Sequence, residues 1–327
     1  MKITHSSFVV ITPVYEDVEA SSLLFKELAF QFQNNVFVVA VDDGSVSQPL
    51  SISALENAHI NGVVLKLKRN VGHQRAIAIG LGYASENIND GRYVIVMDSD
   101  GEDVPLTISD LLQKLKADDV DVVVAQRKNR VETLRFKAFY IIYKWFFHLM
   151  TGRAISFGNF MAFKPHAVKR LVAMQELSLH VASAVLASKL RTGICPLDRG
   201  PRYAGQSKAS FIVQALHGFK ALMVFAEDVL VRVGTACTLV ASFSLIGGVL
   251  AIIFKLLGVA TPGWFSVAMG ILVLMLLQTG GLALITLMLT GIVRSGNLTS
   301  VMSYHDFVDR IIETSVRVPK NLITPRM

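Results

Sequence analysis

The chain contains 327 residues, enough for one large domain or two smaller ones, and 52% of them are hydrophobic, a high share for a soluble enzyme. The net charge of +7 is modest and no basic run with interleaved aromatic residues occurs, which argues against nucleic acid as a partner and favours anionic lipid and phosphate. The two cysteines, Cys195 and Cys237, lie in different segments, so no disulfide framework is expected.

Short apolar runs alternate with segments of helical spacing over the first 125 residues. The apolar runs predict strands at 8–12, 36–41, 62–67, 93–97 and 120–125. Helical spacing predicts helices at 18–32, 74–87 and 106–116. This alternation is typical of an α/β fold of the Rossmann-like class, with a mostly parallel, doubly wound sheet.

Polar residues stand at the carboxyl end of each predicted strand. In chain order they are Thr12, Pro13 and Tyr15, then Asp42 and Asp43, then Arg69 and Asn70, then Asp98 and Asp100, and finally Arg127. Because the carboxyl ends of parallel strands meet at one edge of a sheet, we expect these residues to form one ligand site. No Gly-x-Gly-x-x-Gly follows the first strand, which argues against a nicotinamide cofactor.

The fourth predicted strand runs directly into a group of acids. Four apolar residues precede Asp98 and Asp100, and Glu102 follows two positions later. Carboxylates at this spacing can turn toward one hard cation, so the segment predicts a Mg²⁺ or Mn²⁺ site with these three side chains as ligands. The alternative is a solvated acidic turn that only caps the helix beginning near Leu106.

Two long uncharged stretches follow, at 234–254 and 256–293. Each is long enough for the roughly 20 residues that cross a bilayer, so we predict two transmembrane helices. Arg232 before the first and Arg294 after the second place both flanking segments in the cytoplasm under the positive-inside rule. The first 14 residues contain no recognisable signal peptide, which agrees with a cytoplasmic catalytic domain.

The expected layout has four parts. They are a catalytic domain at 1–210, an amphipathic juxtamembrane helix at 211–233, a transmembrane pair at 234–293 and a cytoplasmic tail at 294–327. The juxtamembrane segment and the aromatic stretch 136–147 could each lie in the headgroup plane. For both, the alternative is packing against the catalytic domain or against a sister subunit in a homo-oligomer. Within the tail, 307–312 is predicted as a short amphipathic helix.

Five short motifs occur in a fixed order along the chain. They are Pro13-Val14-Tyr15, Val41-Asp42-Asp43-Gly44-Ser45, Arg69-Asn70-x-Gly72, Asp98-x-Asp100 and Arg202-x-x-Gly205-x-Ser207-Lys208. Together they resemble the family 2 glycosyltransferases of the GT-A fold. The branch they resemble most is that of the polyprenyl-phosphate sugar synthases, including the dolichol-phosphate mannose synthases. The resemblance covers about residues 7–210, and the paired C-terminal spans are similar to those of bacterial membrane-anchored members.

The resemblance implies a role for each matching residue. Those expected to bind the UDP- or GDP-linked donor are Pro13, Tyr15, Glu16, Asp42, Asp43, Asn70 and Arg75. Asp98 and Asp100, with Glu102, would hold the metal on the diphosphate, and Arg127 would neutralise phosphate charge. Arg202, Ser207 and Lys208 would bind the acceptor phosphate. The alternative for the last group, together with Arg199, is a basic patch that faces the membrane.

Three features depart from the family pattern, and one of them is that His73 and Arg75 occupy the helix start after the third predicted strand. Glu16 and Asp17 follow Tyr15 where relatives have Asn and Glu, and 156–161 lacks the carboxylate that many relatives carry there. An acceptor hydroxyl must lose a proton during attack, usually to a carboxylate, whereas a phosphate is already an anion. The missing carboxylate therefore favours a phosphate acceptor.

We thus expect an inverting, metal-dependent transferase that moves one sugar from a nucleotide diphosphate to a polyprenyl (undecaprenyl) phosphate. It would act at the cytoplasmic face of a bacterial inner membrane as a multi-pass protein. Transfer to a lipid hydroxyl and a non-catalytic, membrane-anchored scaffold are the alternatives. The closely spaced Asp98 and Asp100 argue against a scaffold, which has no need to hold like charges together.

Overall fold

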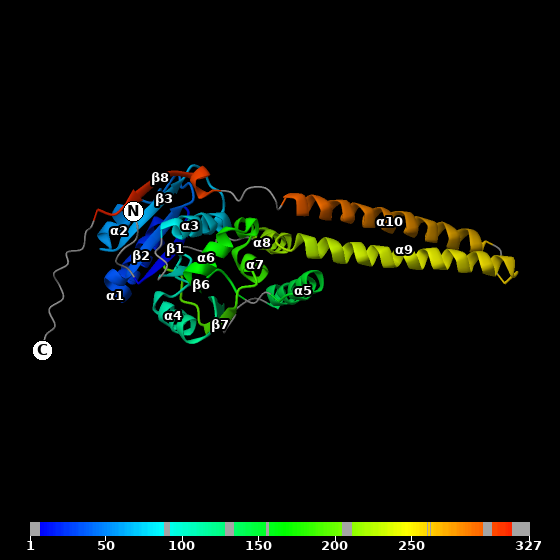
Figure 1. Ribbon diagram of the computed structural model, residues 1–327, viewed down its shortest axis with the longest axis horizontal. Helices are drawn as coiled ribbons and strands as arrows, with labels where there is room; N and C mark the ends of the chain where they lie inside the picture. The colour runs from blue at the N-terminus through cyan, green and yellow to red at the C-terminus, as the bar shows by residue number, and fades with distance from the viewer. Residues whose placement is uncertain are drawn as a thin grey trace. The chain divides into compact units, whose positions relative to one another are not determined.

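The computed structural model describes residues 7–87, 92–127, 134–154, 157–204, 211–259, 261, 263–296 and 303–315 (Figure 1). The chain divides into two compact units. The first comprises Met1–Ala138, Ile155–Val224 and Val301–Met327, and the second comprises Phe139–Ala154 and Phe225–Ser300. The first unit contains the sheet, and the second contains the two longest helices.

A twisted sheet forms the centre of the first unit, with the strand order β7-β5-β6-β4-β1-β2-β3-β8 among the described residues. The strands are β1 (Phe8–Val14), β2 (Val36–Asp42), β3 (Asn61–Leu67), β4 (Tyr93–Val96), β5 (Val122–Arg127), β6 (Met161–Phe163), β7 (Thr192–Leu197) and β8 (Val308–Glu313). Neighbouring strands are parallel, except that β6 runs antiparallel between β4 and β5, and β8 runs antiparallel to β3. The predicted α/β fold with a mostly parallel sheet is confirmed.

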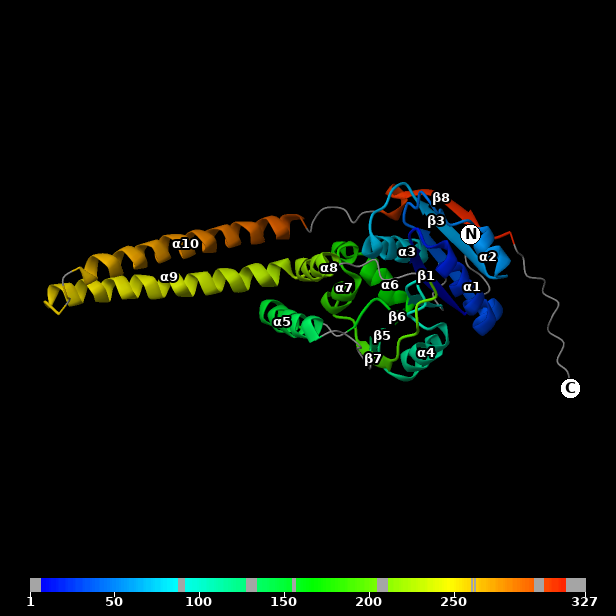
Figure 2. The ribbon, with the colours of Figure 1, turned by 180° about the vertical axis from the view of Figure 1, so that it is seen from behind.

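Helices cover both faces of this sheet (Figure 2). Those of the first unit are α1 (Val18–Phe32), α2 (Ser53–Asn57), α3 (His73–Asn87), α4 (Ile108–Ala117), α6 (Pro165–Val172), α7 (Val181–Ala187) and α8 (Phe211–Met223). Short 3₁₀ turns occur at Gln33–Asn35, Pro105–Thr107, Gln175–Ser178 and Tyr304–Asp306. Successive residues of β1 enter opposite cores: Val9 and Ile11 pack with α3, while Phe8 and Val10 pack with α1. Burial on both faces explains why these strands are continuous apolar runs.

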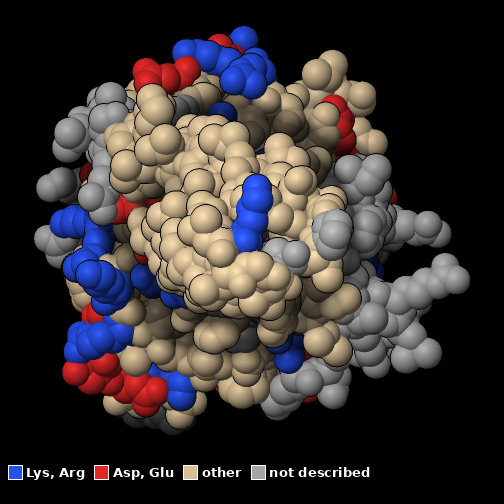
Figure 3. All heavy atoms as spheres, turned by 90° about the vertical axis from the view of Figure 1, so that its right-hand side faces the viewer, with Lys and Arg blue, Asp and Glu red and all other residues tan. Residues whose placement is uncertain are grey.

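The second unit contains α5 (Leu134–Thr151, from Phe139 onward), α9 (Ala226–Leu256) and α10 (Trp264–Gly296). Two segments, Ala226–Leu256 and Trp264–Val293, are helices long and apolar enough to cross a bilayer. Seen from the right-hand side of Figure 1, the end of this helix pair presents an almost uncharged surface (Figure 3). The predicted juxtamembrane helix is divided, because α8 ends at Met223 and α9 begins at Ala226.

The segment 307–312 is not the short helix that its apolar spacing predicts. Residues 308–312 lie in β8, which pairs with β3 at the edge of the sheet, and the amide of Lys68 donates to the carbonyl of Phe307 just before the strand (2.9 Å). Just before this strand, the ring of Tyr304 packs against Tyr83, and its hydroxyl donates to Glu86. In so short a segment, hydrogen bonding to a free sheet edge outweighs the weak local helical preference.

Candidate active site

Two buried carboxylates organise the loop after β2, and one of them joins it to the loop after β3. Asp43 accepts hydrogen bonds from the amides of Val71 (2.7 Å) and Gly72 (2.9 Å). Asp42 accepts from the amides of Ser45 (3.1 Å) and Leu50 (3.0 Å), and so folds its own loop. Burial raises the pKa of Asp43, although the two amides partly offset this effect. Both carboxylates thus shape the edge where a nucleotide was predicted.

Gly44 makes this close approach of the two loops possible. Its φ is +68°, and a Cβ atom there would lie 2.4 Å from the carbonyl carbon of Arg69. A side chain would therefore be strained by the backbone conformation and would also clash with the β3 loop. Asn70, beside that contact, is exposed at the same edge.

Glu16 also binds backbone amides of the β2 loop. Its carboxylate accepts from Val46 (2.6 Å), Ser47 (3.0 Å) and Gln48 (2.6 Å), and its own φ is +48°. Tyr15 beside it is half exposed. Donor binding by Pro13, Tyr15, Glu16, Asp42, Asp43 and Asn70 stays a prediction. The hydrogen bonds described here show that three of these residues, Glu16, Asp42 and Asp43, fold the loops.

Asp98 follows β4 and meets a histidine that the motif analysis did not select. Its Oδ1 lies 3.2 Å from Nε2 of His73, the first residue of α3, and Nδ2 of Asn159 lies 3.1 Å from the same nitrogen. The Asp98 amide donates to Oδ2 of Asp103 (2.9 Å). A signal for His73 was present in the sequence, because it directly follows the Arg69-Asn70-x-Gly72 motif at a helix start.

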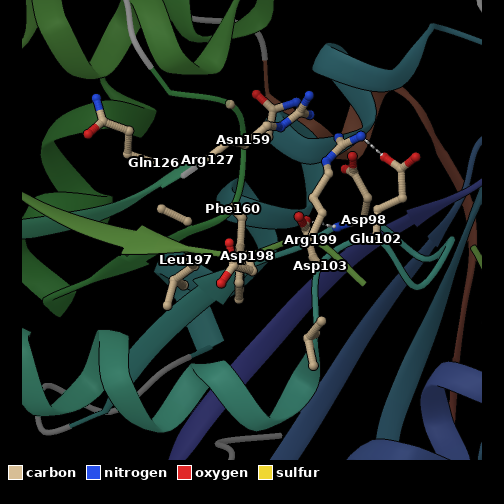
Figure 4. A pocket seen from close by; sticks show the side chains of 13 residues that line it. Asp98, Glu102, Asp103, Gln126, Arg127, Asn159, Phe160, Leu197, Asp198 and Arg199 are labelled. Carbon is tan, nitrogen blue, oxygen red and sulfur yellow. Dashed lines mark hydrogen bonds and ion pairs between the residues drawn. The ribbon is translucent and has the colours of Figure 1, made fainter. Parts of the chain in front are cut away.

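Two arginines from the segment after β7 pair with the other acids. Arg202 reaches Asp100 through Nη2 (2.7 Å) and Glu102 through Nε (3.1 Å). Arg199 forms an ion pair with Glu102, drawn as a dashed line in Figure 4. Arg202 was expected to bind an acceptor phosphate, and the structure brings it to two of the predicted metal ligands.

Backbone contacts hold the two segments together. The amide of Gly200 donates to the carbonyl of Glu102 (3.0 Å), and the amide of Tyr203 donates to that of Asp100 (2.9 Å). Gly101 has a φ of +89°, and a Cβ atom there would lie 2.7 Å from the Tyr203 ring. The acidic loop is therefore built to receive the arginine segment.

The pKa values of the acids in this loop are shifted in different directions. Burial opposes ionisation of Asp98, but His73, Arg199 and Arg202 outweigh it and hold the pKa of Asp98 below its usual range. Burial, with the charge of Asp98 nearby, raises the pKa of Asp100 and places the pKa of Asp103 well above its usual range. Like charges so close together are typical of functional sites.

A pocket opens beside this loop (Figure 4). Asp98 and Glu102 line it together with Arg127, Asn159 and Arg199, so the structure brings Arg127 to the predicted site. Exposed Asp198, which sequence analysis missed, also lines the pocket. The sequence alone could not show that Asp198 lines the pocket, because the segment containing Leu197 and Arg199 reaches the pocket only in the folded chain.

Among the described residues, Arg75 does not line this pocket. Arg75 belongs to the first turn of α3, and its Nε is buried without a hydrogen-bond partner among the residues that the structure describes. Ser207 and Lys208 fall outside the described residues.

The acidic loop fits a divalent cation by the chemistry of its donors. Carboxylate oxygens suit Mg²⁺ or Mn²⁺, and one or two carboxylates are enough when substrate phosphates complete the shell. Oδ1 of Asp98 is buried, and His73 is its one close polar neighbour among the described residues. Within that part of the chain no three His, Cys, Asp or Glu side chains are arranged around a common point. Asp98 and Asp100 are the residues that could hold a metal on a diphosphate.

A histidine pair, in which His180 is buried and His217 is exposed, links α7 to α8. Nε2 of His180 lies 3.0 Å from Nε2 of His217, and Nδ1 of His180 accepts from the Ser183 amide (3.1 Å) at the start of α7. Burial, reinforced by His217, lowers the pKa of His180 from its ordinary 6.5 to about 3. Neutral His180 therefore helps to hold α8 against α7 within the first unit.

Acidification will weaken this contact. The unfolded chain binds a proton at His180 below pH 6.5, while the folded chain does not until about pH 3, so the stabilisation present above pH 6.5 is lost as the pH falls through that window. At about pH 5 the loss is roughly 2 kcal/mol. His180→Asn keeps an N-capping side chain but cannot titrate. Thermal unfolding in detergent should show a smaller drop in Tm for the variant than for the parent. An equal drop contradicts the prediction.

Comparison with known proteins places this site in context. Residues 9–171 match the family model described as glycosyl transferase family 2. The chain is 27% identical over 281 residues to glycosyltransferase YkoT of Bacillus subtilis (strain 168), covering 84% of this chain and 79% of that protein. It is 25% identical over 150 residues to dodecaprenyl-phosphate galacturonate synthase of Rhizobium johnstonii, covering 44% and 42% of the two chains. The structure of S. aureus TarS 1-349 in complex with UDP-GlcNAc superposes with a TM-score of 0.46 at 19% identity, covering 71% of this chain and 66% of TarS.

Proposed function

Because the chain belongs to glycosyl transferase family 2, we propose that it transfers a single sugar from a nucleoside diphosphate sugar to a polyprenyl phosphate. The family and the enzyme class are as the sequence motifs predicted. A relative that is a dodecaprenyl-phosphate galacturonate synthase supports the choice of acceptor. The donor would be UDP- or GDP-linked.

The observation that supports a phosphate acceptor best is the pair of guanidinium groups at the pocket. Arg127 and Arg199 both line it, and Arg202, three residues after Arg199, pairs with Asp100 of the adjoining acidic loop. Guanidinium groups bind phosphate oxygens through paired hydrogen bonds. Asn159, which lines the same pocket, can orient an acceptor but cannot accept its proton.

The proposed mechanism is a single displacement with inversion. The acceptor oxygen attacks the anomeric carbon, the carbon–oxygen bond to the diphosphate breaks, and the nucleoside diphosphate leaves with the bonding electrons. Arg127 would stabilise the charge on the leaving group. Asp98 and Asp100 would hold Mg²⁺ or Mn²⁺, which supplies further stabilisation of that charge when bound. Arg202 must exchange Asp100 for the acceptor phosphate as the substrates enter.

One observation favours a hydroxyl acceptor as the second candidate. Asp198 lines the pocket and is exposed, so it could accept a proton from an attacking hydroxyl. A phosphate acceptor has no such need.

The test is turnover with a panel of nucleotide sugars and two acceptors, undecaprenyl phosphate and undecaprenol, using the full chain in lipid nanodiscs. We expect product from the phosphate alone, and Asp198→Asn should retain most of this activity. Turnover of the alcohol that is lost in Asp198→Asn would establish the hydroxyl reading in its place. Absence of turnover with every donor would contradict both.

The enzyme would act at the cytoplasmic face of a bacterial inner membrane, anchored by α9 and α10. Their length and apolar character, together with flanking Arg232 and Arg294, support this orientation. On a background with Cys195 and Cys237 replaced by Ser, a membrane-impermeant thiol reagent should label Thr261→Cys in intact cells. Ser47→Cys, which is exposed in the β2 loop, should react only after the cells are opened. Labelling of Ser47→Cys from outside would reverse the proposed orientation.

A further inference from the structure

Helix α5 carries an exposed apolar stripe. Five large side chains, none of them charged, are exposed along its second half: Ile141, Ile142, Trp145, Phe146 and Leu149. Ile141 and Trp145 expose 67% and 64% of their surface, whereas Phe147 exposes 1%. At 3.6 residues per turn, the five fall within an arc of about 140°. Phe147 lies on the opposite side, so α5 has one apolar face inside the unit and a second apolar face outside it.

The inner face of α5 is fixed to the beginning of α9. The ring of Phe147 meets that of Phe225 edge to face, with 5.8 Å between centroids. Arg232 donates from Nη1 to the carbonyl of Leu149 (3.0 Å), and the guanidinium of Arg153 lies 4.9 Å from the Phe225 ring centre. These contacts fix the orientation of α5 about its own axis. The outer stripe therefore cannot turn inward, and it needs an apolar partner from outside the unit.

We propose that α5 lies in the plane of the membrane, with this stripe inserted at the boundary between headgroups and acyl chains. The partner is the lipid bilayer, because α5 belongs to the same compact unit as α9 and α10, the two helices suited to cross it. An amphipathic helix buries its apolar face to a shallow depth in such an interface.

The residues that border the stripe are of the types expected for shallow insertion into a membrane. Lys144 and His148 are exposed one turn apart along one border of the stripe, where a long cationic side chain can reach the headgroups. Trp145 stands within the stripe, and tryptophan is enriched at the membrane–water interface. A crossing orientation is excluded for α5, since Phe147 packs on Phe225 and Lys144 would then face hydrocarbon. This inference adds a third membrane contact to the two spanning helices and does not depend on the substrate.

Fluorescence quenching tests the proposal, because Trp145 and Trp264 are the two tryptophans of the chain. Trp264→Phe leaves Trp145 as the sole emitter, and Trp145→Phe leaves Trp264 as the matched control. Each full-length variant is reconstituted into phosphatidylethanolamine–phosphatidylglycerol vesicles whose acyl chains are brominated either near the headgroup or near the chain end. We expect Trp145 to be quenched severalfold more strongly by the shallow bromines than by the deep ones.

Two other outcomes overturn the proposal. Unquenched emission at short wavelength, with cross-linking between subunits at Ile142→Cys, would mean that a second copy of the chain covers the stripe. Unquenched emission at the wavelength of water-exposed tryptophan would mean that the stripe is bare. If Trp264→Phe fails to fold, a spin label at Ile142→Cys, on the background without native cysteines, gives the same answer. Its relaxation should respond more to oxygen than to a water-soluble nickel chelate, and the reverse response contradicts the proposal.

Discussion

Asp100→Asn is expected to lower kcat by roughly a hundredfold to a thousandfold, the scale observed when one preorganised charge-stabilising group is removed from an active site. The change removes one of the two carboxylates that could hold a metal on the diphosphate, and it also removes one of the two carboxylate partners of Arg202. The fold should persist, because Asn still accepts the hydrogen bond from the Glu102 amide. Steady-state turnover and a thermal unfolding curve measure the two effects separately.

Asp110→Asn is the matched control for this variant, since Asp110 is exposed on α4 and lies outside the acidic loop. It should leave kcat unchanged. A chelator should reproduce the effect of Asp100→Asn on the parent protein, and added Mg²⁺ or Mn²⁺ should reverse it. Full activity in excess chelator would exclude the metal and would leave the arginines as the stabilising charges.

Arg202→Ala should weaken binding of the lipid phosphate by roughly 1.5–3 kcal/mol, the contribution of a hydrogen bond to a charged group. This corresponds to an increase in acceptor KM of about tenfold or more, since 1.4 kcal/mol is a factor of ten. Arg202→Lys should recover only part of the loss, because lysine lacks the planar fork. Donor KM should change little, since the loops after β2 and β3 keep their own hydrogen bonds.

Acceptor and donor KM measured with undecaprenyl phosphate and undecaprenol separate the possibilities. Arg170→Ala, an exposed arginine on α6, serves as the control for loss of positive charge. If the donor KM alone changes, Arg202 acts only through Asp100 and Glu102. If the alcohol is used as well as the phosphate, the acceptor is not recognised by its charge.

Much of the catalytic edge could be predicted from the sequence because parallel strands buried on both faces are continuous apolar runs. Once those runs are found, the residues that end them must share one edge, and Asp98, Asp100 and Arg127 do so. The pairing of Arg202 with Asp100 could not be predicted, since the two residues are 102 positions apart and meet only through the fold. The same holds for β6, whose three residues enter the sheet antiparallel and carry too little pattern to identify a strand.

The local pattern was misleading where a distant partner decided the conformation. Ile311 and Ile312 with Phe307 suit one side of a helix turn as well as they suit an edge strand. Backbone pairing with β3 selects the strand. His73 was not predicted as a site residue for a related reason, because a histidine at a helix start becomes significant only when Asp98 lies opposite.

The pairing of β8 with β3 also orders the events of biosynthesis. The amide of Gly62 donates to the hydroxyl of Thr314, 252 residues later, and both helices α9 and α10 lie between them in the chain. The ribosome must therefore complete the entire apolar hairpin before the edge of β3 can be covered. Until then that edge is an open template for pairing with other chains. The apolar hairpin is thus an insertion within a folding unit, and a chain truncated after α10 would leave the sheet with an uncovered edge.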